Sequence, residues 1–500
     1  MKKKKLKQPL PGETEKESGN PYVFSNIKNL MSKIRKPPPP GAKTVDVLII
    51  GCGPGGYAAA VRASQLGLTT AVVEFDAVGG MCLNWGCIPT KSLLKSAQVL
   101  HYARQAADYG VQIKGRVKPD VPAMVTRSRN VVDDMKKGIE HVLTKNNIEL
   151  IKGMARVNAD RSVSVFNLPD SRQQIFSDHI IIATGASPRP LPFAPFDHNR
   201  IISSQLAIAP ARVPKLLTIV GSGAIGCEMA WFFNTLGTKV TLIESREAIA
   251  PAEDADVSAH LARAFRKAGI SVFTSAQVVS IETKKIGCKV ALQTKRGEAT
   301  HWASSVLVAV GTDANVIPLA LDKAGVVMEQ GRIKVDKYYR TSAEGVYAIG
   351  DVIATPALAH VASAEAVVCV EHLAGLPVQP IDYSNIPMCI YTVPETASVG
   401  FTEQAAREKG YRLRIGKAYY MASGKAAATG EKDGFVKLIF NAADDTLLGA
   451  HLVGANVTEL IAGLVTARQK GATASDIMRS VYPHPTMSEA IIEAASSITE

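Results

Sequence analysis

The chain has 500 residues and a formal net charge of +12 at pH 7. Its length exceeds what one hydrophobic core covers and predicts about three or four domains. The first 45 residues contain ten Lys and one Arg against three Glu, a net charge of +8, so the other 455 residues carry only +4. A nucleic-acid function therefore has little support. No apolar run approaches the roughly 18 to 20 residues that span a bilayer, so no membrane span is expected.

The first 44 residues are expected to form a disordered basic extension that ends in a Pro-rich linker at positions 37–40. Apolar residues between positions 22 and 34 approach helical spacing, so a short docking helix is the alternative. The extension has neither the apolar segment of a secretory signal nor the composition of a transit peptide. Seven Cys, an odd number, suggest a reducing compartment, where a disulfide is usually catalytic. We expect a cytoplasmic protein, with an organelle matrix as the alternative.

Two copies of one β-α-β unit are predicted from residue 45 onward. The first copy combines a buried strand at 45–50, a helix at 54–66 and a strand at 70–74. The second combines a strand at 216–220, a helix at 224–236 and a strand at 239–244. This order indicates an α/β fold with two Rossmann-like dinucleotide-binding domains.

Each unit contains a turn of the form G-x-G-x-x-G. The first glycine makes the tight turn, the second lets backbone approach a pyrophosphate, and the third lets the helix pack closely on the strand. An acidic residue, Glu74 or Glu244, follows the first glycine by 23 residues and would bind a ribose hydroxyl. Two copies with identical spacing predict two bound dinucleotides. The glycines are Gly51, Gly53 and Gly56 in the first unit, and Gly221, Gly223 and Gly226 in the second.

Cys82 and Cys87 lie between the first unit and the next predicted helix. Two Cys five positions apart can close a small disulfide if the backbone between them is tight, and Gly86 favours such a turn. Zinc binding is the rival interpretation, but no second Cys/His cluster follows, so no metal is expected. Inert core cysteines are the third interpretation, and the other five Cys are expected to be buried structural thiols.

Residues 82–91, CLNWGCIPTK, resemble the redox-active signature of the pyridine nucleotide-disulfide oxidoreductases, and in particular of their lipoamide branch. Matching motifs follow in order: ATG at 183–185, VG at 310–311, GDV at 350–352, YT-x-PE at 391–395 and HPTMSE at 484–489. The resemblance covers residues 45–500. It implies an FAD-binding and central region at 45–195 and 315–386, an NAD-binding domain at 196–314, and a C-terminal α+β dimerisation domain at 387–500.

The resemblance also implies FAD in the first unit and NAD in the second. Lys91 would lie beside the flavin and pair with Glu228, and Asp351 would hold the ribityl chain. The implied FAD-binding residues are Gly51, Gly53, Gly56, Glu74, Lys91, Gly153, Thr184, Gly185, Asp351 and Ala359. The implied NAD-binding residues are Gly221, Gly223, Gly226, Glu228, Glu244, Val278 and Gly311.

The implied reaction is oxidation of protein-bound dihydrolipoamide with reduction of NAD⁺. Cys82 would exchange with the substrate dithiol, and Cys87 would face the flavin. His484 and Glu489 would form a dyad that serves the cysteines of the other subunit of a homodimer. The implied partner is the lipoyl-bearing protein of a 2-oxo acid dehydrogenase or glycine-cleavage complex.

Two alternatives remain open from the sequence. An NADPH-dependent enzyme like glutathione reductase shares the cysteine pair and the dyad. Glu244 argues against it, because a carboxylate repels a 2′-phosphate, although Arg246 is close. A redox-silent scaffold of a multienzyme complex is the other alternative, and the presence of both cysteines argues against it. Residues 312–315, TDAN, depart from the family pattern near the expected nicotinamide.

Overall fold

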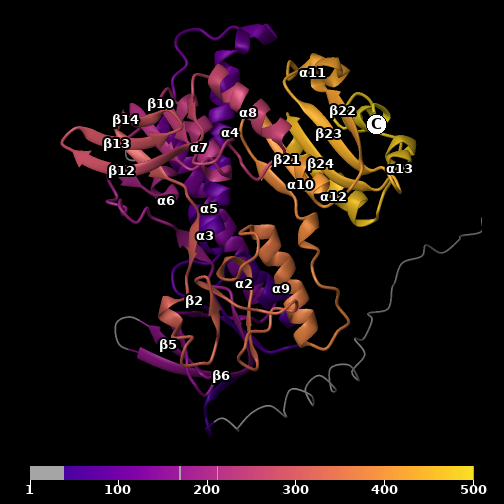
Figure 1. Cartoon of the computed structure of the whole chain (residues 1–500). Coiled ribbons are helices and arrows are strands. Elements are labelled where there is room, and N and C mark those ends of the chain that lie inside the picture. The colour runs from indigo at the N-terminus through magenta and orange to yellow at the C-terminus, as the bar shows by residue number, and fades with distance from the viewer. Residues whose placement is uncertain (1–38, 168–170, 211, 499–500) are drawn as a thin grey trace, which may run out of the picture.

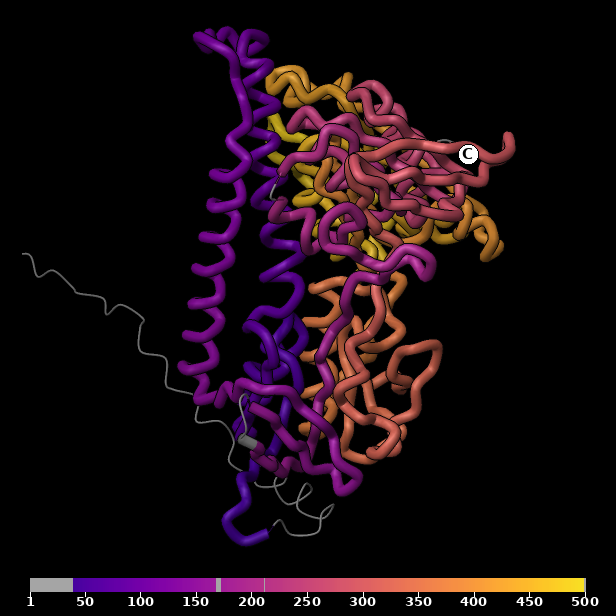
Figure 2. Tube along the Cα trace, turned by 90° about the vertical axis from the view of Figure 1, so that its left-hand side faces the viewer, coloured from indigo at the N-terminus to yellow at the C-terminus, as the bar shows by residue number. Residues whose placement is uncertain are grey.

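The computed structural model describes residues 39–167, 171–210 and 212–498 of the chain. The predicted extension at residues 1–44, with its alternative docking helix, lies almost wholly outside them. Strand β1 (Lys43–Ile50) begins two residues earlier than expected, because Lys43 and Thr44 already pair with Ile175 and Phe176 of β6. The chain forms three lobes, one below and two above in Figure 1, and two long helices run along them in Figure 2.

The first lobe contains a seven-stranded sheet in the order β3-β2-β1-β6-β5-β4, with β19 also paired to β6. Strands β1, β2, β3, β6 and β19 are parallel, whereas β4 and β5 are antiparallel. Residues 47–49 of β1 are fully buried, as expected of a central parallel strand. Its other strands are β2 (Thr70–Glu74), β3 (Glu149–Lys152), β4 (Met154–Val157), β5 (Val163–Asn167), β6 (Ser171–Ile182) and β19 (Val346–Ala348). Helices α2 (Pro54–Gln65) and α9 (Ala359–Leu373) pack together on this sheet.

The second lobe repeats the architecture with a five-stranded parallel sheet in the order β11-β10-β9-β15-β8. Its strands are β8 (Ile201–Ile202), β9 (Leu216–Val220), β10 (Lys239–Ile243), β11 (Ser271–Phe273) and β15 (Ser305–Val308). Helices α6 (Ser204–Ala207), α7 (Ala224–Thr235) and α8 (Ala255–Lys267) belong to this lobe. A separate antiparallel sheet contains β12 (Ala276–Lys284), β13 (Gly287–Thr294) and β14 (Gly297–Ala303).

A short antiparallel ribbon connects the first two lobes. It pairs β7 (Ala186–Pro188) with β16 (Thr312–Ala314), so the chain enters and leaves the second lobe at one place. After the ribbon, the chain forms η2 (Ile317–Leu319), the pair β17 (Met328–Glu329) and β18 (Arg332–Ile333), and η3 (Gly350–Val352). Between β18 and η3, strand β19 pairs with β6, so the chain returns to the sheet of the first lobe after it leaves the second.

The third lobe is an antiparallel five-stranded sheet in the order β20-β21-β24-β23-β22, covered by helices. Its strands are β20 (Met388–Ile390), β21 (Glu395–Gly400), β22 (Leu413–Tyr419), β23 (Phe435–Asn441) and β24 (Leu447–Gly454). The helical turns are η4 (Tyr383–Asn385), which precedes β20, and η5 (Tyr420–Ala422). The helices are α10 (Glu403–Glu408), α11 (Gly424–Thr429), α12 (Val457–Gln469), α13 (Ala474–Arg479) and α14 (Glu489–Ser496). Strand β24 is buried along its whole length and forms the centre of this core.

Helices α3 (Gly80–Trp85), α4 (Cys87–Arg104) and α5 (Val121–Lys145) connect the lobes, with η1 (Ala106–Tyr109) following α4. Helix α5 has 25 residues and is about 37 Å long, so it runs beside more than one lobe (Figure 2). Helix α4 packs against both α5 and α7. Across the described ranges, none of the helices is long and apolar enough to cross a membrane. The predicted fold class is confirmed.

Candidate active site

The first glycine turn lies between β1 and α2. Gly51 has a φ of +102°, and a Cβ there would lie 2.4 Å from the carbonyl oxygen of Ala183. A Cβ on Gly56 would lie 1.9 Å from the Gly51 oxygen. Only glycine fits either position, which leaves bare backbone at the N-terminus of α2. Glu74 ends β2 and accepts a hydrogen bond of 2.7 Å from the amide of Cys52, while burial raises the pKa of its carboxyl group.

The second turn, between β9 and α7, has the same geometry. Gly221 has a φ of +97°, and a Cβ on Gly226 would lie 2.0 Å from the Gly221 oxygen. Glu244 follows β10 and accepts from the amide and hydroxyl of Ser222 at 3.0 and 2.7 Å. Although burial acts in the opposite direction, hydrogen bonds from Arg246 and Ser222 lower the pKa of Glu244. This residue is therefore an anion at neutral pH.

Both turns open into one connected cavity of about 2330 Å³. Backbone from Gly51, Gly53, Gly221 and Gly223 forms part of its wall, the kind of surface that pyrophosphate groups contact. The predicted site residues that line it are Gly51, Gly53, Glu74, Cys82, Cys87, Lys91, Gly153, Thr184, Gly185, Gly221, Gly223, Glu228, Glu244, Val278, Gly311, Asp351 and Ala359. The predicted residues Gly56 and Gly226 do not line it, because they pack helix against strand.

Cys82 and Cys87 face the cavity from two consecutive helices. Cys82 lies in α3, Gly86 separates the helices, and Cys87 is the first residue of α4. A Cβ on Gly86 would lie 3.0 Å from the oxygen of Met81 and 3.3 Å from the Cα of Cys82, so the backbone between the thiols is tight. Both cysteines are thiols in this structure. The arrangement places the two cysteines next to each other at the wall of the cavity.

The two thiols differ in acidity. A hydrogen bond from the Cys82 thiol and the nearby Lys91 ammonium together lower the pKa of Cys87 to about 7, against the effect of burial. The same hydrogen bond, together with burial, raises the pKa of Cys82. The position of Cys87 at the N-terminus of α4 also favours a thiolate. Cys87 therefore ionises first.

Lys91 connects the two cofactor regions. Its ammonium donates to both carboxylate oxygens of Glu228 at 2.9 and 2.8 Å, and Glu228 is only 3% exposed. The ammonium also lies 4.4 Å from the ring centroid of Tyr391, whose amide donates to Glu228. Because Lys91 comes from α4 and Glu228 from α7, the pair fixes the first lobe to the second beside the cysteines.

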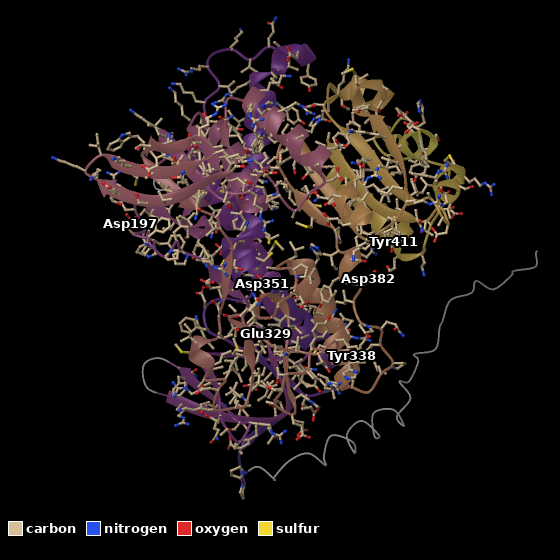
Figure 3. The ribbon with its side chains drawn as sticks, in the orientation of Figure 1. Asp197, Glu329, Tyr338, Asp351, Asp382 and Tyr411 are labelled. Carbon is tan, nitrogen blue, oxygen red and sulfur yellow. The ribbon has the colours of Figure 1, made fainter. Side chains whose placement is uncertain are left out.

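Asp351 lies near the middle of the molecule, below the two upper lobes (Figure 3). It belongs to η3, and burial raises the pKa of its carboxyl group while Arg332 acts in the opposite direction. Arg332 also donates to the backbone oxygen of Asp351. A partly buried carboxyl group at the cavity wall is a suitable acceptor for hydroxyl groups of a sugar or polyol.

Two of the cavity residues that the predicted site did not include contact predicted site residues directly. Asn315 exchanges hydrogen bonds with Thr184 across the ribbon: the Thr184 hydroxyl donates to its carbonyl at 2.8 Å, and its amide donates to the Thr184 carbonyl at 3.0 Å. Tyr391 packs against Lys91. Both residues stood in stretches that the sequence analysis had noted, the departure at 312–315 and the motif at 391–395. Of the five other cysteines, Cys389 is only partly buried and lines the cavity.

The dyad of His484 and Glu489 lies apart from the cysteines. Nδ1 of His484 is 2.8 Å from Oε1 of Glu489. The other carboxylate oxygen of Glu489, Oε2, accepts a hydrogen bond from the amide of Thr486. The His484 side chain is 79% exposed and does not line the cavity. A single chain therefore forms the dyad but does not bring it to Cys82.

Comparison with known proteins agrees with this geometry. The family model described as pyridine nucleotide-disulphide oxidoreductase matches residues 45–366, and that of the family's dimerisation domain matches residues 386–495. Dihydrolipoyl dehydrogenase of Rhizobium etli is 44% identical over 91% of this chain and 98% of its own length. The Bacillus subtilis protein of the same name is 40% identical with the same coverage. The crystal structure of LpdA from Mycobacterium tuberculosis has a TM-score of 0.85 at 27% identity and covers 90% of this chain and 99% of its own. The chain belongs to the pyridine nucleotide-disulphide oxidoreductase family.

Proposed function

We propose that this protein is a dihydrolipoyl dehydrogenase, which oxidises a protein-bound dihydrolipoyl group and reduces NAD⁺ through FAD. The observation that carries the proposal is the dithiol pair Cys82 and Cys87 beside a cavity with two dinucleotide turns. Relatives that are 40 to 44% identical over nine tenths of the chain carry this name, which supports the choice of substrate.

The residues present fit both cofactors. We assign the first glycine turn, Glu74 and Asp351 to FAD, because they offer backbone amides and two carboxylates to a pyrophosphate and hydroxyl groups. We assign the second turn and Glu244 to NAD⁺. The ionised Glu244 supports NAD⁺ over NADP⁺, since it repels a 2′-phosphate. When bound, FAD supplies the electron relay between a dithiol and the nicotinamide.

The cysteines then have different roles. One substrate thiolate attacks the sulfur of Cys82 in the Cys82–Cys87 disulfide, and Cys87 leaves as a thiolate. The second substrate thiolate attacks the substrate sulfur of this mixed disulfide, which closes the lipoyl ring and releases Cys82. The low pKa of Cys87, about 7, supports its assignment as the leaving thiolate, because low-pKa thiols leave faster. Lys91 stabilises that thiolate while Glu228 holds the ammonium in place.

A homodimer supplies the general base that takes the proton from the substrate thiol. We infer that the partner subunit's His484 takes the substrate proton, with Glu489 orienting its ring, and the dimerisation-domain match over residues 386–495 supports this. The inferred partner is a lipoyl-bearing protein of a 2-oxo acid dehydrogenase or glycine-cleavage complex. We place the enzyme in the cytoplasm, because the Rhizobium and Bacillus relatives are bacterial.

An assay of four substrate pairs tests the proposal. Dihydrolipoamide with NAD⁺ should give turnover, whereas dihydrolipoamide with NADP⁺, and glutathione disulfide with NADH or NADPH, should give little. The C82S and C87S variants should each lose dihydrolipoamide oxidation, and C288A, which changes a buried cysteine of β13, should retain it. Turnover only with glutathione disulfide and NADPH would contradict the proposal. Dihydrolipoamide oxidation that survives in C82S would contradict the cysteine assignment.

A further inference from the structure

Trp85 is an exposed aromatic residue inside the redox turn. It ends α3, three positions after Cys82 and two before Cys87, and lines the cavity with both cysteines. Its side chain is 38% exposed, whereas its neighbours Leu83 and Asn84 are each 4% exposed. The packing of α3 thus depends on Leu83 and Asn84. Burial in the core does not account for an indole at position 85.

Asn84 anchors the turn without help from the indole. Its side-chain amide donates to the carbonyl oxygens of Val78 and Gly80, both at 2.9 Å. These two bonds fix the start of α3 to the segment that precedes it. The local backbone is therefore held in place independently of which side chain follows at position 85.

Arg129 of α5 holds the indole. Its Nη1 donates to the carbonyl oxygen of Asn84 at 2.8 Å, and its guanidinium carbon lies 5.1 Å from the centroid of the Trp85 ring. Its Nε and Nη2 atoms are buried and have no hydrogen-bond acceptor among the described residues. An aromatic face attracts a guanidinium group, which offsets part of that loss. The guanidinium is thus held by the Asn84 carbonyl on one side and by the Trp85 ring on the other.

The dihydrolipoyl group has the chemistry that suits such a ring. Its two thiols lie at one end of an apolar chain of methylene groups, which ends in an amide. When a substrate thiolate reaches Cys82, the indole of Trp85, which lines the same cavity three positions along α3, offers an apolar wall to the chain. Glutathione, a charged peptide, gains little from that wall.

We propose that Trp85 is a specificity-determining residue that packs against the methylene chain of the dihydrolipoyl group, and that Arg129 is a positioning residue that holds the indole. This inference rests on the proposed function. It adds a contact with the part of the substrate that does not react, and it explains a preference among thiol substrates that the cysteine pair cannot provide.

The test measures KM and kcat of the flavin-loaded dimer with two substrates. One is dihydrolipoamide, and the other is an analogue whose chain is shorter by two methylene groups. Loss of the apolar contact in W85A should raise KM for dihydrolipoamide about five- to tenfold, with kcat changed less than about twofold. Shortening the chain should raise KM for the unchanged protein but hardly for W85A. W85F should retain most of the discrimination, and R129M should lose part of it.

W302A is the matched control. Trp302 of β14 is 49% exposed and does not line the cavity, so its removal should leave both KM values unchanged. Equal KM values for W85A and the unchanged protein would overturn the assignment of Trp85, and so would an equal effect of chain length in both. Loss of the dimer or of flavin in W85A would assign the indole a structural role instead and would also overturn it. No oxidation of dihydrolipoamide by the unchanged protein would overturn the proposed function itself, and this inference with it.

Discussion

Lys437 lies at the centre of a buried ion-pair cluster between the second and third lobes. Its ammonium contacts Asp254 and Glu403 at 2.8 Å and Asp256 at 3.1 Å. Lys437 is 3% and Asp254 1% exposed, whereas Asp256 and Glu403 are 45% and 32% exposed. Asp254 also caps α8 by accepting from the amide of Asp256. The cluster therefore joins α8 of the second lobe to β23 and α10 of the third.

The substitution K437M removes the ammonium and keeps most of the side-chain volume. It leaves the Asp254 carboxylate buried with two amide donors, those of Asp256 and Glu403. Removing one partner of a buried pair costs about 3 to 5 kcal/mol, and these remaining donors place the expected loss at the lower end, about 3 kcal/mol. The two more exposed carboxylates are solvated by water and add less than about 1 kcal/mol.

The free energy of unfolding from denaturant titrations checks this value. K417M is the control, because Lys417 contacts only the exposed Asp256 in this cluster and should cost less than about 1 kcal/mol. The double variant K437M/D254N should recover much of the loss, since no buried charge remains. Burial raises the pKa of Asp254, but His451, Lys437 and the Glu403 amide lower it more. Its contribution is therefore complete above the ordinary carboxyl pKa of about 4 and is lost as pH falls below it. A loss in K437M no larger than that in K417M at pH 7 would refute the reasoning.

Three further predictions concern the site and its surroundings. In K91M the pKa of Cys87, about 7 in the unchanged protein, should rise, because the ammonium that lowers it is gone. A pH titration of thiolate absorbance measures this pKa. An unchanged midpoint would contradict the role of Lys91. Burial raises the pKa of Glu253 to about 7, so the free energy of unfolding should fall by up to roughly 3 kcal/mol as pH rises from about 4.5 to 7. The E253Q variant should lose this pH dependence when unfolding is measured across the same range. G56A should lose bound flavin and stability, because its Cβ would lie 1.9 Å from a backbone oxygen, whereas G463A, with open space around it, should retain both. Flavin absorbance and thermal unfolding compare the two variants. A G56A protein with full flavin would refute the packing argument.

The two β-α-β units could be predicted from the sequence because their signals are local. The strands expected at 70–74 and 216–220 are β2 and β9 with the same bounds, and each expected helix is only one residue longer than observed. Apolar runs define buried strands, and glycines mark backbone that no side chain can follow. The start of β1 was less predictable, because Lys43 is paired with Ile175, far along the chain.

The functional site was predicted only in part, and the reason is distance along the chain. Motifs identified the cysteines and the glycine turns, but they did not identify Asn315, whose role depends on hydrogen bonds to Thr184 across the ribbon. Tyr391 was likewise absent from the predicted site, because only folding brings its ring to Lys91. The contact of Arg129 with Trp85 had no signal in the sequence at all.

The sequence by itself determined that this chain has two dinucleotide turns and a cysteine pair between them, because glycine spacing and strand periodicity are properties of neighbouring residues. Only the tertiary structure decided that both turns open into one cavity and that Cys87 is the more acidic thiol. The acidity of Cys87 depends on a hydrogen bond from Cys82 across the turn at Gly86. It also depends on the Lys91 ammonium, which is held in place by Glu228 of the second lobe. Electrostatic effects of this kind depend on distances in space, which the order of residues does not contain.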